Sequence, residues 1–461
     1  MKKTKLITTA LIFSISFMNI SPLFAFAAKT AKTDKKVTQQ NALKANVVSY
    51  INMDWWNVYN DEYLSDYIMK ALDKNQDLKI ASLNVEEARQ NVKIGLSNEL
   101  PSLSVGVSPL LYKMPGVSNT DGLFSVPLIA SYEADIFLKN HDKTKSSKKL
   151  YEATQLKEKA TYIAVISSVG ATYYNLVKID KLIDIQEQII NDRKQIFDLM
   201  KQSNKEGIVS TSDLVKAEKA YVASTSDLIE LKKAREIMLN SLAVLTGDSP
   251  ENSHGFKRIN YDKLVYTRNI PESIPSSIIE NRPDYLAAEK MVEKAGIDVR
   301  VAKKEFLPTI NIIGLLGFNA GGSYSAMNWK NSLALLAGSA MLPIFTGGKR
   351  IANLKIMKTR YEQVLQNYYK TNLTAIQEVN DSLSNVKLDN EKFEKNLKTL
   401  QMEQKDFKYT EAKYNQGTIS YLDLLQHKEN LLDMQKMVVS SKTNCLISQI
   451  SLYKAVAGEN L

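Results

Sequence analysis

Residues 100–104 read Leu-Pro-Ser-Leu-Ser, and residues 307–311 read Leu-Pro-Thr-Ile-Asn. Further along each half of the chain, residues 207–210 read Gly-Ile-Val-Ser and residues 417–420 read Gly-Thr-Ile-Ser. The two halves therefore carry matching motifs in the same order and at nearly the same spacing. A duplication of this length indicates one structural unit used twice. We expect function to arise from how the copies assemble rather than from one catalytic pocket.

The duplication divides the chain into expected segments. We predict a first repeat over residues 51–249, an irregular insert over 250–282 and a second repeat over 283–461. Ahead of the first repeat we expect a signal peptide over residues 1–28, followed by a polar, mobile segment over 29–50.

The amino terminus has the parts of a secretory signal peptide. Three early lysines precede an apolar run from Leu6 to about Phe17, and small residues at 25–27 predict cleavage near Ala27/Ala28. This run is shorter than the ~20 residues that a membrane span needs, and we expect no later transmembrane helix. Because Cys445 is the single cysteine, we expect no internal disulfide. The absence of a cysteine near the predicted cleavage site argues against an amino-terminal lipid anchor.

The charges of the chain are interspersed. The formal net charge of the 461 residues is +10, but Lys, Glu and Asp alternate without a basic block or interleaved aromatic residues. This pattern favours solvated helix surfaces and argues against a nucleic-acid partner.

Two long stretches without proline predict very long helices. Proline is absent from residues 128–249 and from residues 344–461, and it costs ~3 kcal/mol inside a helix. Apolar residues recur there at alternating spacings of three and four, which is typical of a coiled-coil seam. We expect one helical hairpin over about 139–246 and another over about 347–457.

Each hairpin breaks at a Gly-x-x-Ser-x-x-Asp motif. Gly207 and Gly417 are suited to end the first helix of each hairpin. The serine that follows can cap the next helix, with Asp213 or Asp423 completing a capping box. Capping is one interpretation of these aspartates. The other, compatible with it, is that symmetry-related copies near an axis create a negative field.

Alternation of apolar and polar residues predicts strands ahead of each hairpin. The first repeat favours strands over about 102–112 and 123–137, and the second repeats them less cleanly over about 309–318 and 331–345. Each strand is long enough to cross a membrane.

Four such strands cannot close a barrel, and an open sheet edge cannot lie in lipid. Three chains would together supply twelve strands, whereas two would give eight, whose interior side chains nearly fill the bore. We therefore expect an α+β membrane protein: a homotrimer with a 12-stranded β-barrel, continued by a long α-helical barrel. Glu133 and Asp135 share the polar side of one predicted strand, so we expect them to face the lumen rather than to form a catalytic acid pair.

The ordered motifs resemble the TolC-like outer-membrane efflux proteins, including their nodulation-type branch. The resemblance runs from about Trp55 to Gly458. The motifs that carry it include Trp55-Trp56, Glu87-Ala88-Arg89, Leu100-Pro101-Ser102-Leu103, Tyr132-Glu133-Ala134-Asp135-Ile136-Phe137, Asn281-Arg282-Pro283-Asp284 and Pro343-Ile344-Phe345-Thr346-Gly347-Gly348.

The resemblance implies a homotrimer in the cell outer membrane, surrounded by its lipid and extending into the periplasm. It implies a passive exit duct of a tripartite efflux or secretion system. The implied partners are a periplasmic adaptor protein and an inner-membrane RND or ABC-type transporter. The implied closed tip is held by polar contacts and opens when the hairpins untwist.

The resemblance also implies positions for the tip. Tyr414, Gly417 and Asp423 match the family's tip motif, with Asp423 at the position of an aspartate that rings the aperture. Asp213 and Gly207 are the equivalents in the first repeat. Two departures are Ile419, where some members have an arginine that locks the tip, and Gln426, which replaces a second ring aspartate.

No constellation in the sequence indicates an enzyme, a cofactor or a metal site. The three histidines, His141, His254 and His427, are scattered without a second ligand at metal spacing. The alternative to a conduit is a coiled-coil structural or surface spacer protein, which would not need four alternating strands between helices. The sequence does not name the transported substrate.

Overall fold

The computed structural model describes residues 55–106, 108–112, 121–266, 277–321 and 332–456. All of them belong to one compact unit, Met53–Leu461. The predicted signal peptide and the segment over 29–50 lie outside the described residues.

The described helices occur as two matching sets. Helices α3 and α7 have 22 residues each, α4 and α8 have 67 each, and α5 and α9 have 36 and 35. Their bounds are Gln76–Ser97 for α3, Lys139–Lys205 for α4, Thr211–Thr246 for α5, Pro283–Lys304 for α7, Lys349–Asn415 for α8 and Tyr421–Ala455 for α9. At 1.5 Å per residue, α4 and α8 are each about 100 Å long.

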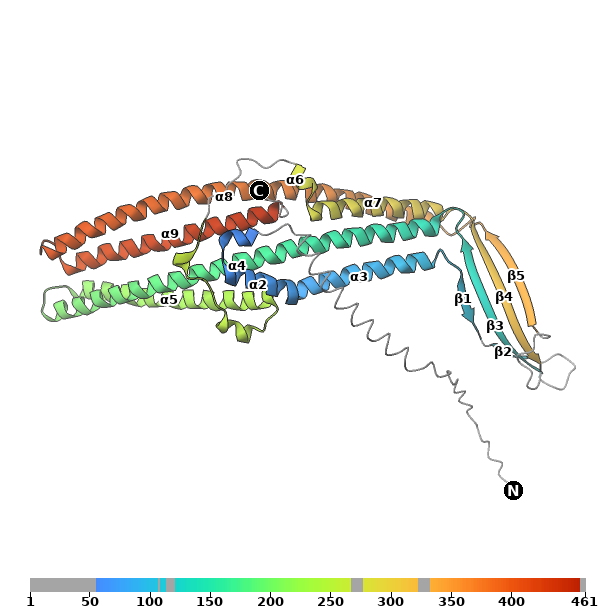
Figure 1. Cartoon of the computed structure of the whole chain (residues 1–461), viewed down its shortest axis with the longest axis horizontal. Coiled ribbons are helices and arrows are strands. Elements are labelled where there is room, and N and C mark those ends of the chain that lie inside the picture. The colour runs from blue at the N-terminus through green and yellow to red at the C-terminus, as the bar shows by residue number, and fades with distance from the viewer. Residues whose placement is uncertain (1–54, 107, 113–120, 267–276, 322–331, 457–461) are drawn as a thin grey trace, which may run out of the picture. The chain divides into compact units, whose positions relative to one another are not determined.

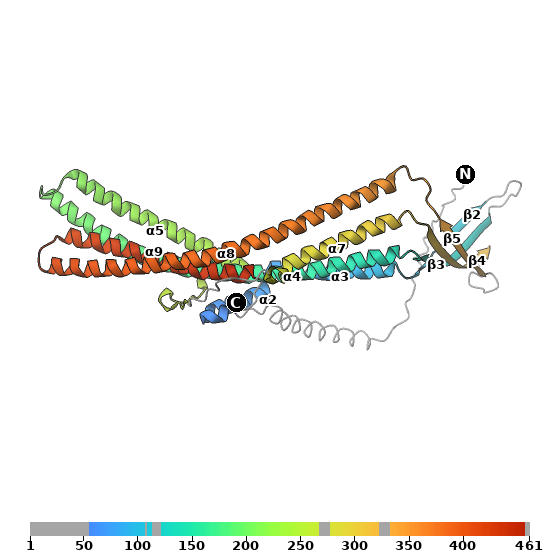
Figure 2. The same ribbon diagram turned by 90° about the horizontal axis from the view of Figure 1, so that it is seen from above.

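The two long helices are the framework of this unit. The shorter α3 and α5 follow one another along α4, and α7 and α9 follow one another along α8. Contacts of α4 with α7 and with α9 join the halves. Four helices therefore lie side by side next to the strands, in the order α3, α4, α7, α8. Four lie side by side toward the hairpin turns, in the order α5, α4, α9, α8 (Figures 1 and 2).

The middle of α4 is covered on several sides. Two short helices ahead of α3, η1 (Trp55–Tyr59) and α2 (Glu62–Lys74), lie against this region. Trp55 stacks on Tyr453 with 5.8 Å between ring centroids. A Cβ at Gly170 would lie 2.8 Å from the Trp55 ring, so this close approach requires glycine.

The segment ahead of the first strand forms two helices, α2 and α3, which are divided at Asn75. The Asn75 side chain accepts a hydrogen bond from the Leu78 N–H and so caps α3. Its amide also donates to the Leu245 carbonyl of α5, 2.8 Å away. Capping by asparagine ends α2 and starts α3 without any glycine or proline.

A small antiparallel sheet lies at one end of the helices (Figure 1). Its strand order is β1-β3-β4-β5, and β2 also pairs with β3. The central pair joins the two halves of the chain, with Ile129 opposite Leu315. The strands are β1 (Ser102–Val105), β2 (Ser108–Tyr112), β3 (Asp121–Ala134), β4 (Thr309–Gly321) and β5 (Ser332–Met341).

The first predicted strand is interrupted, and two short strands, β1 and β2, take its place in the sheet. The Gly106 N–H donates to the Pro127 carbonyl at 2.9 Å, but Pro127 has no N–H to return. The interruption between β1 and β2 lies opposite this proline, which explains why the strand over 102–112 is not continuous. Strand β5 ends at Met341, before Pro343, rather than at 345.

The two faces of the sheet differ in chemistry. Residues opposite one another in an antiparallel pair share a face. One face carries Glu133 opposite Asn311 and the partners Ser102 and Ser131, whose hydroxyls are 2.7 Å apart, together with apolar residues such as Ile313, Leu315 and Leu335. The described positions of the other face carry no charge and are apolar or small: Leu103, Val105, Val126, Leu128, Ala130, Tyr132, Ala134, Ile310, Ile312, Gly314, Leu316, Ala334, Leu336, Gly338 and Ala340.

The insert between the repeats contains the short helices η2 (Pro250–Gly255), η3 (Tyr261–Lys263) and α6 (Ser277–Glu280). Beyond it, the buried Arg282 donates to Asp284, to Glu378 of α8 and to the carbonyl of Ala455 at the end of α9. This arginine therefore ties the start of α7 to both helices of the second hairpin.

Within the part of the chain that the structure describes, none of the helices combines the length and apolar character required to cross a membrane.

Candidate functional site

The first hairpin turn joins α4 to α5. Gly207 has φ of +73°, the left-handed conformation that glycine adopts most readily. Its N–H donates to the Asn204 carbonyl and the Ile208 N–H donates to the Ser203 carbonyl, which forms a Schellman motif. The Ser210 side chain then accepts from the Asp213 N–H at 3.1 Å and caps α5.

The second turn, between α8 and α9, has the same backbone. Gly417 has φ of +71°, and the Thr418 N–H donates to the Lys413 carbonyl. Ser420 and Asp423 form a complete capping box, in which the Ser420 hydroxyl accepts from the Asp423 N–H and the Asp423 carboxylate accepts from the Ser420 N–H. Both aspartates thus contribute to capping.

The carboxylates of the two aspartates have different surroundings. Asp213 accepts a hydrogen bond from Lys216 at 2.9 Å and another from Ser210 at 2.8 Å. These bonds, that from Lys216 first, hold the pKa of Asp213 below its ordinary value. Asp423 is exposed and forms none of the ion pairs found among the described residues. The negative charge of Asp213 is therefore offset by Lys216, whereas the negative charge of Asp423 has no basic partner among the described residues.

The residues before the two glycines also differ. In the first turn, the Asn204 amide donates to the Val209 carbonyl of its own loop at 2.9 Å. In the second, the Tyr414 ring packs against Tyr421, with 5.6 Å between centroids. The Tyr421 hydroxyl in turn donates to Gln195 of α4 at 2.5 Å. The second turn is thus connected to the first hairpin.

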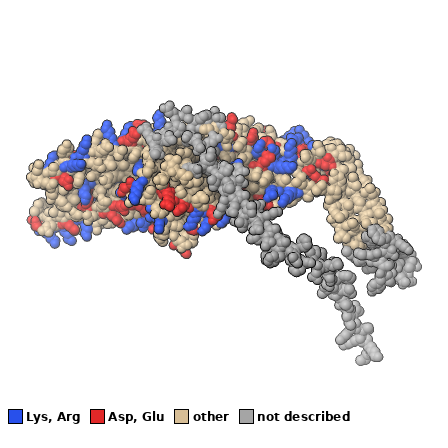
Figure 3. All heavy atoms as spheres, in the orientation of Figure 1, with Lys and Arg blue, Asp and Glu red and all other residues tan. Residues whose placement is uncertain are grey.

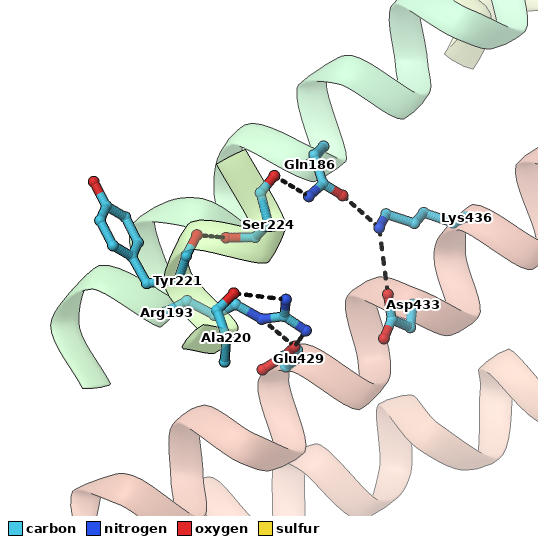
Figure 4. A network of polar contacts seen from close by, with 8 residues as sticks. All are labelled: Gln186, Arg193, Ala220, Tyr221, Ser224, Glu429, Asp433 and Lys436. Atoms are coloured by element: carbon cyan, nitrogen blue, oxygen red, sulfur yellow. Dashed lines mark hydrogen bonds and ion pairs between the residues drawn. The ribbon is translucent and has the colours of Figure 1, made fainter. Parts of the chain in front are cut away.

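Further polar contacts join the hairpins beyond the turns (Figure 4). Arg193 of α4 donates through Nε to Glu429 of α9 at 2.6 Å, and through Nη1 to the Ala220 carbonyl of α5 at 3.1 Å. Gln186 of α4 accepts from Lys436 of α9 at 2.6 Å and donates to the Ser224 carbonyl of α5. We call these contacts of Gln186, Arg193, Glu429 and Lys436 the inter-hairpin network.

A partly buried ion pair adds to this connection. Lys428 of α9 donates to Asp192 of α4 at 2.7 Å, and the Asp192 side chain has no exposed surface. The Glu429 side chain beside it is 10% exposed. Since removing one partner of a buried pair leaves the other charge without compensation, separating α9 from α4 here requires rehydration of both pairs.

The other predicted tip residue, Gln426, lies exposed on α9. The structure brings Tyr414, Gly417 and Asp423 together at one turn, and Gly207 and Asp213 at the other. The residues that join the hairpins were not predicted from the sequence: Gln186, Asp192, Arg193, Gln195, Lys428, Glu429 and Lys436. A signal that could have pointed to them is the pair Asp192-Arg193, which places charge on a side of α4 where Ile183, Ile185 and Ile189 are buried.

The predicted lumen residues lie at the junction of sheet and helices. Glu133 is in β3, and its carboxylate pairs with Lys139 at 2.6 Å. Asp135 is not in a strand, which corrects the prediction, because β3 ends at Ala134. Its carboxylate accepts from the N–H groups of Lys139 and His141 and stabilises the start of α4.

Each histidine lies near a single carboxylate. The nearest are Glu99 for His141, Glu236 for His254 and Asp406 for His427, which is the shortest pair at 2.8 Å. Among the described residues, no three His, Cys, Asp or Glu side chains are grouped closely enough to hold a metal ion. Cys445 is buried, and burial raises its pKa to about 11.

The paired hairpins, the small sheet with one apolar face and the duplicated design define an outer-membrane channel protein. The chain belongs to the outer membrane efflux protein family, whose model matches residues 67–248 and 274–458. This confirms the family to which the sequence motifs pointed, while the nodulation-type branch stays a prediction. The function is that of an efflux channel of the outer membrane.

Similar proteins are also named as efflux proteins or outer membrane channels. The chain is 26% identical over 419 residues to a probable efflux pump outer membrane protein of Pseudomonas putida, TtgC, covering 89% of this chain and 86% of the relative. It is 25% identical over 423 residues to the cation efflux system protein CusC of Escherichia coli O157:H7, covering 91% of each. The crystal structure of the Campylobacter jejuni CmeC outer membrane channel matches with a TM-score of 0.82 and 25% identity, covering 88% of each chain.

Proposed function

We propose that three copies of this chain close into one channel. The sheet has four strand positions, since β1 and β2 share one of them. One edge is formed by β1 and β2 and the other by β5, and each edge carries unpaired backbone groups on one side. Such edges are unstable in lipid, where each unpaired group costs several kcal/mol. When the β5 edge pairs with the β1–β2 edge of the next copy, the backbone groups of both edges form hydrogen bonds. Three copies then give a closed barrel with twelve strand positions.

The sheet chemistry supports this arrangement. The uncharged face that contains Leu103, Val105 and Leu336 suits contact with lipid, and all three side chains are exposed in the single chain. The opposite face carries Ser131, Glu133 and Asn311 among apolar residues, and these polar side chains suit a water-filled lumen. The restriction of the charge and of most polar side chains of the described strands to one face is the observation that carries the proposal.

The helices continue the barrel as a tube in the periplasm. Four helices lie side by side at each level of the chain, so three copies would supply a wall of twelve. The exposed apolar residues of α3, α5 and α8 suit burial between copies. Examples are Leu83, Ile229 and Leu373, which are each at least 65% exposed.

The channel acts as the passive exit duct of a tripartite pump. A periplasmic adaptor and an inner-membrane RND or ABC-type transporter deliver substrates to it. Relatives are named for the efflux of toluene, of antibiotics and of cations. Channels of one family therefore serve very different solutes. This supports the view that the partner proteins, rather than the channel, select the substrate.

The hairpin turns form the closed periplasmic tip. Asp423, Tyr414 and Gln426 of the second turn, with Gly207, Asp213 and Gly417, are the residues of this gate. The inter-hairpin network and the Tyr421–Gln195 contact hold α9 against α4. The gate opens when these contacts separate. The amino-terminal signal peptide is cleaved near Ala27/Ala28 during export.

Conductance of the purified protein in a planar lipid bilayer tests the proposal. A trimer in detergent that forms pores of uniform, cation-sensitive conductance supports it. A protein that stays monomeric, or a trimer that never conducts, contradicts it. Asp423→Ala should weaken block of the pore by divalent cations while leaving strand content and trimer formation intact.

A further inference from the structure

Basic side chains are concentrated where the long helices begin, next to the sheet. Residues 139–150, at the start of α4, contain five lysines and one acidic residue, and residues 349–360, at the start of α8, contain five basic residues and no acidic one. At the opposite ends of the same helices, residues 194–205 and 404–415 contain three basic residues each, with one and two acidic residues. The positive charge therefore gathers at the sheet end.

Helix stability does not explain this placement. A helix begins with a partial positive charge, so basic residues in its first turns are unfavourable and acidic ones are favourable. Helix α8 nevertheless starts with Lys349-Arg350, has no acidic residue in its first turn and has no side-chain cap. In α4 the Asp135 carboxylate and Asp142 offset this charge, but α8 has no such compensation, and a local rule broken there indicates a partner outside the helix.

The basic residues lie on two sides of the layer formed by α4, α7 and α8. Lys139 pairs with Glu133 of the polar sheet face, and Lys143 follows one turn later on the same side. Lys145 lies about 200° around the helix from Lys143 at 3.6 residues per turn. Two separate grooves of the layer support this division into two sides. Lys143 lines one groove, and Lys145 and Arg300 line the other.

Five lysines on the side away from Glu133 form a group that we call the basic collar. All five are exposed, none takes part in an ion pair among the described residues, and all lie within about 15 Å of the helix ends next to the sheet. Three helices contribute to the collar: Lys145 and Lys148 from α4, Lys303 from α7, and Lys355 and Lys358 from α8.

An apolar rim separates the collar from the strands. Ile344 and Phe345 are 92% and 88% exposed, and Ile136, Leu138 and Leu342 are each more than half exposed. In Figure 3 the described strands are almost entirely tan on the face shown, whereas the helices beside them carry both blue and red atoms. Apolar surface next to an unpaired basic band is the arrangement that suits the boundary between acyl chains and headgroups.

We propose that the basic collar binds the headgroups of anionic phospholipids in the periplasmic leaflet of the membrane that holds the barrel. This inference rests on the proposed function, because it places the sheet in lipid and the helices in the periplasm. The charge complementarity selects an anionic lipid surface over a zwitterionic one. Each lysine near such a surface contributes about 1 kcal/mol, or about fivefold in binding.

Native mass spectrometry of the full channel tests the collar. The detergent-purified protein is incubated with equal amounts of phosphatidylglycerol and phosphatidylcholine of the same acyl chains. We expect phosphatidylglycerol to be retained preferentially. Replacing the five collar lysines with Gln should lower that preference about tenfold, since not every lysine reaches the headgroup at once.

A matched variant separates location from total charge. Lys194, Lys205, Lys219, Lys405 and Lys408 are exposed near the hairpin turns and form no ion pair among the described residues. Replacing all five with Gln removes the same charge and should leave the lipid preference unchanged.

Three results would overturn the inference: equal retention of the two lipids by the native channel, equal loss of preference in both variants, or displacement of phosphatidylglycerol by inorganic phosphate at millimolar concentration. Conductance in a bilayer of phosphatidylcholine alone distinguishes this failure from failure of the proposed function. A native channel that conducts there but shows no lipid preference refutes only the collar, whereas one that never conducts refutes the duct.

Discussion

The polar side chains of the first hairpin turn satisfy their own hairpin, whereas those of the second turn reach the other one. Asn204 bonds to its own loop and Lys216 neutralises Asp213. In the duplicate, Tyr414 packs on Tyr421, which bonds to Gln195 of α4. The backbones of the turns are the same, so the duplication preserved the hairpin while its side chains diverged. For the proposed gate, this difference predicts that α8 and α9 are the moving part.

Breaking the inter-hairpin network should have the largest effect. Arg193→Ala leaves Glu429 largely buried without its partner, which destabilises the contact between α4 and α9 by about 3 kcal/mol. We expect a lower thermal unfolding midpoint and a larger open fraction in single-channel recordings.

The double variant Arg193→Met with Glu429→Leu is the control for that experiment. Replacing both members of a buried pair with apolar residues of similar size is often neutral. The double variant should therefore recover most of the stability. If it is as unstable as Arg193→Ala, the loss does not come from an unpaired charge.

Removing the bond between the second turn and α4 should have a smaller effect. Tyr421→Phe deletes one exposed hydrogen bond, worth about 1 kcal/mol, and should raise the open fraction up to about fivefold. Asn204→Ala removes a bond of the first turn to its own loop and should leave the open fraction unchanged. Equal opening in both variants would mean that the two turns do not differ in function.

The two aspartates should differ in their effect on cations. Asp423→Ala removes a carboxylate without a basic partner, so block of the pore by divalent cations should weaken several-fold. Asp213→Ala removes a carboxylate already paired with Lys216, and the block should change little. Measuring block against cation concentration for both variants checks the contrast, and a stronger effect of Asp213→Ala would reverse it.

The smallest effect concerns pH. The Lys216 hydrogen bond, followed by that of Ser210, lowers the pKa of Asp213. The resulting stabilisation is present above the ordinary aspartate pKa and is lost as pH falls through the lowered value. Lys216→Met should make this acid-dependent loss of the thermal midpoint smaller, whereas Lys219→Met should not. An unchanged pH profile in Lys216→Met would argue against the pairing in solution.

Much of this fold could be predicted from the sequence because proline and glycine mark its boundaries. The first hairpin was expected from about residue 139, where α4 begins, and Gly207 and Gly417 do occupy left-handed positions. The division between α2 and α3 at Asn75 could not be predicted in this way, because an asparagine cap needs no glycine or proline. The interruption of the first strand was missed because it depends on Pro127 of a neighbouring strand.

The site was harder to predict than the fold. Motifs placed the turns, and the capping role of both aspartates follows from local spacing. The contacts of Arg193 with Glu429 and of Lys428 with Asp192 join residues more than 230 positions apart. Their pairing depends on the rotation of α9 against α4, which no local pattern specifies. Asp135 was placed in a strand because the alternation of apolar and polar residues continues beyond Ala134, the last residue of β3 with a partner in β4.

The claim that the gate opens by separation of α9 from α4 can be tested by holding the two helices together. Gln195→Cys with Tyr421→Cys, in a Cys445→Ser background, places two thiols at the contact between the second turn and α4. A short thiol-specific crosslinker applied during conductance recording should hold the channel in its low-conductance state, and cleavage of the crosslinker should restore opening. Crosslinked trimers that open as often as uncrosslinked ones would contradict the account.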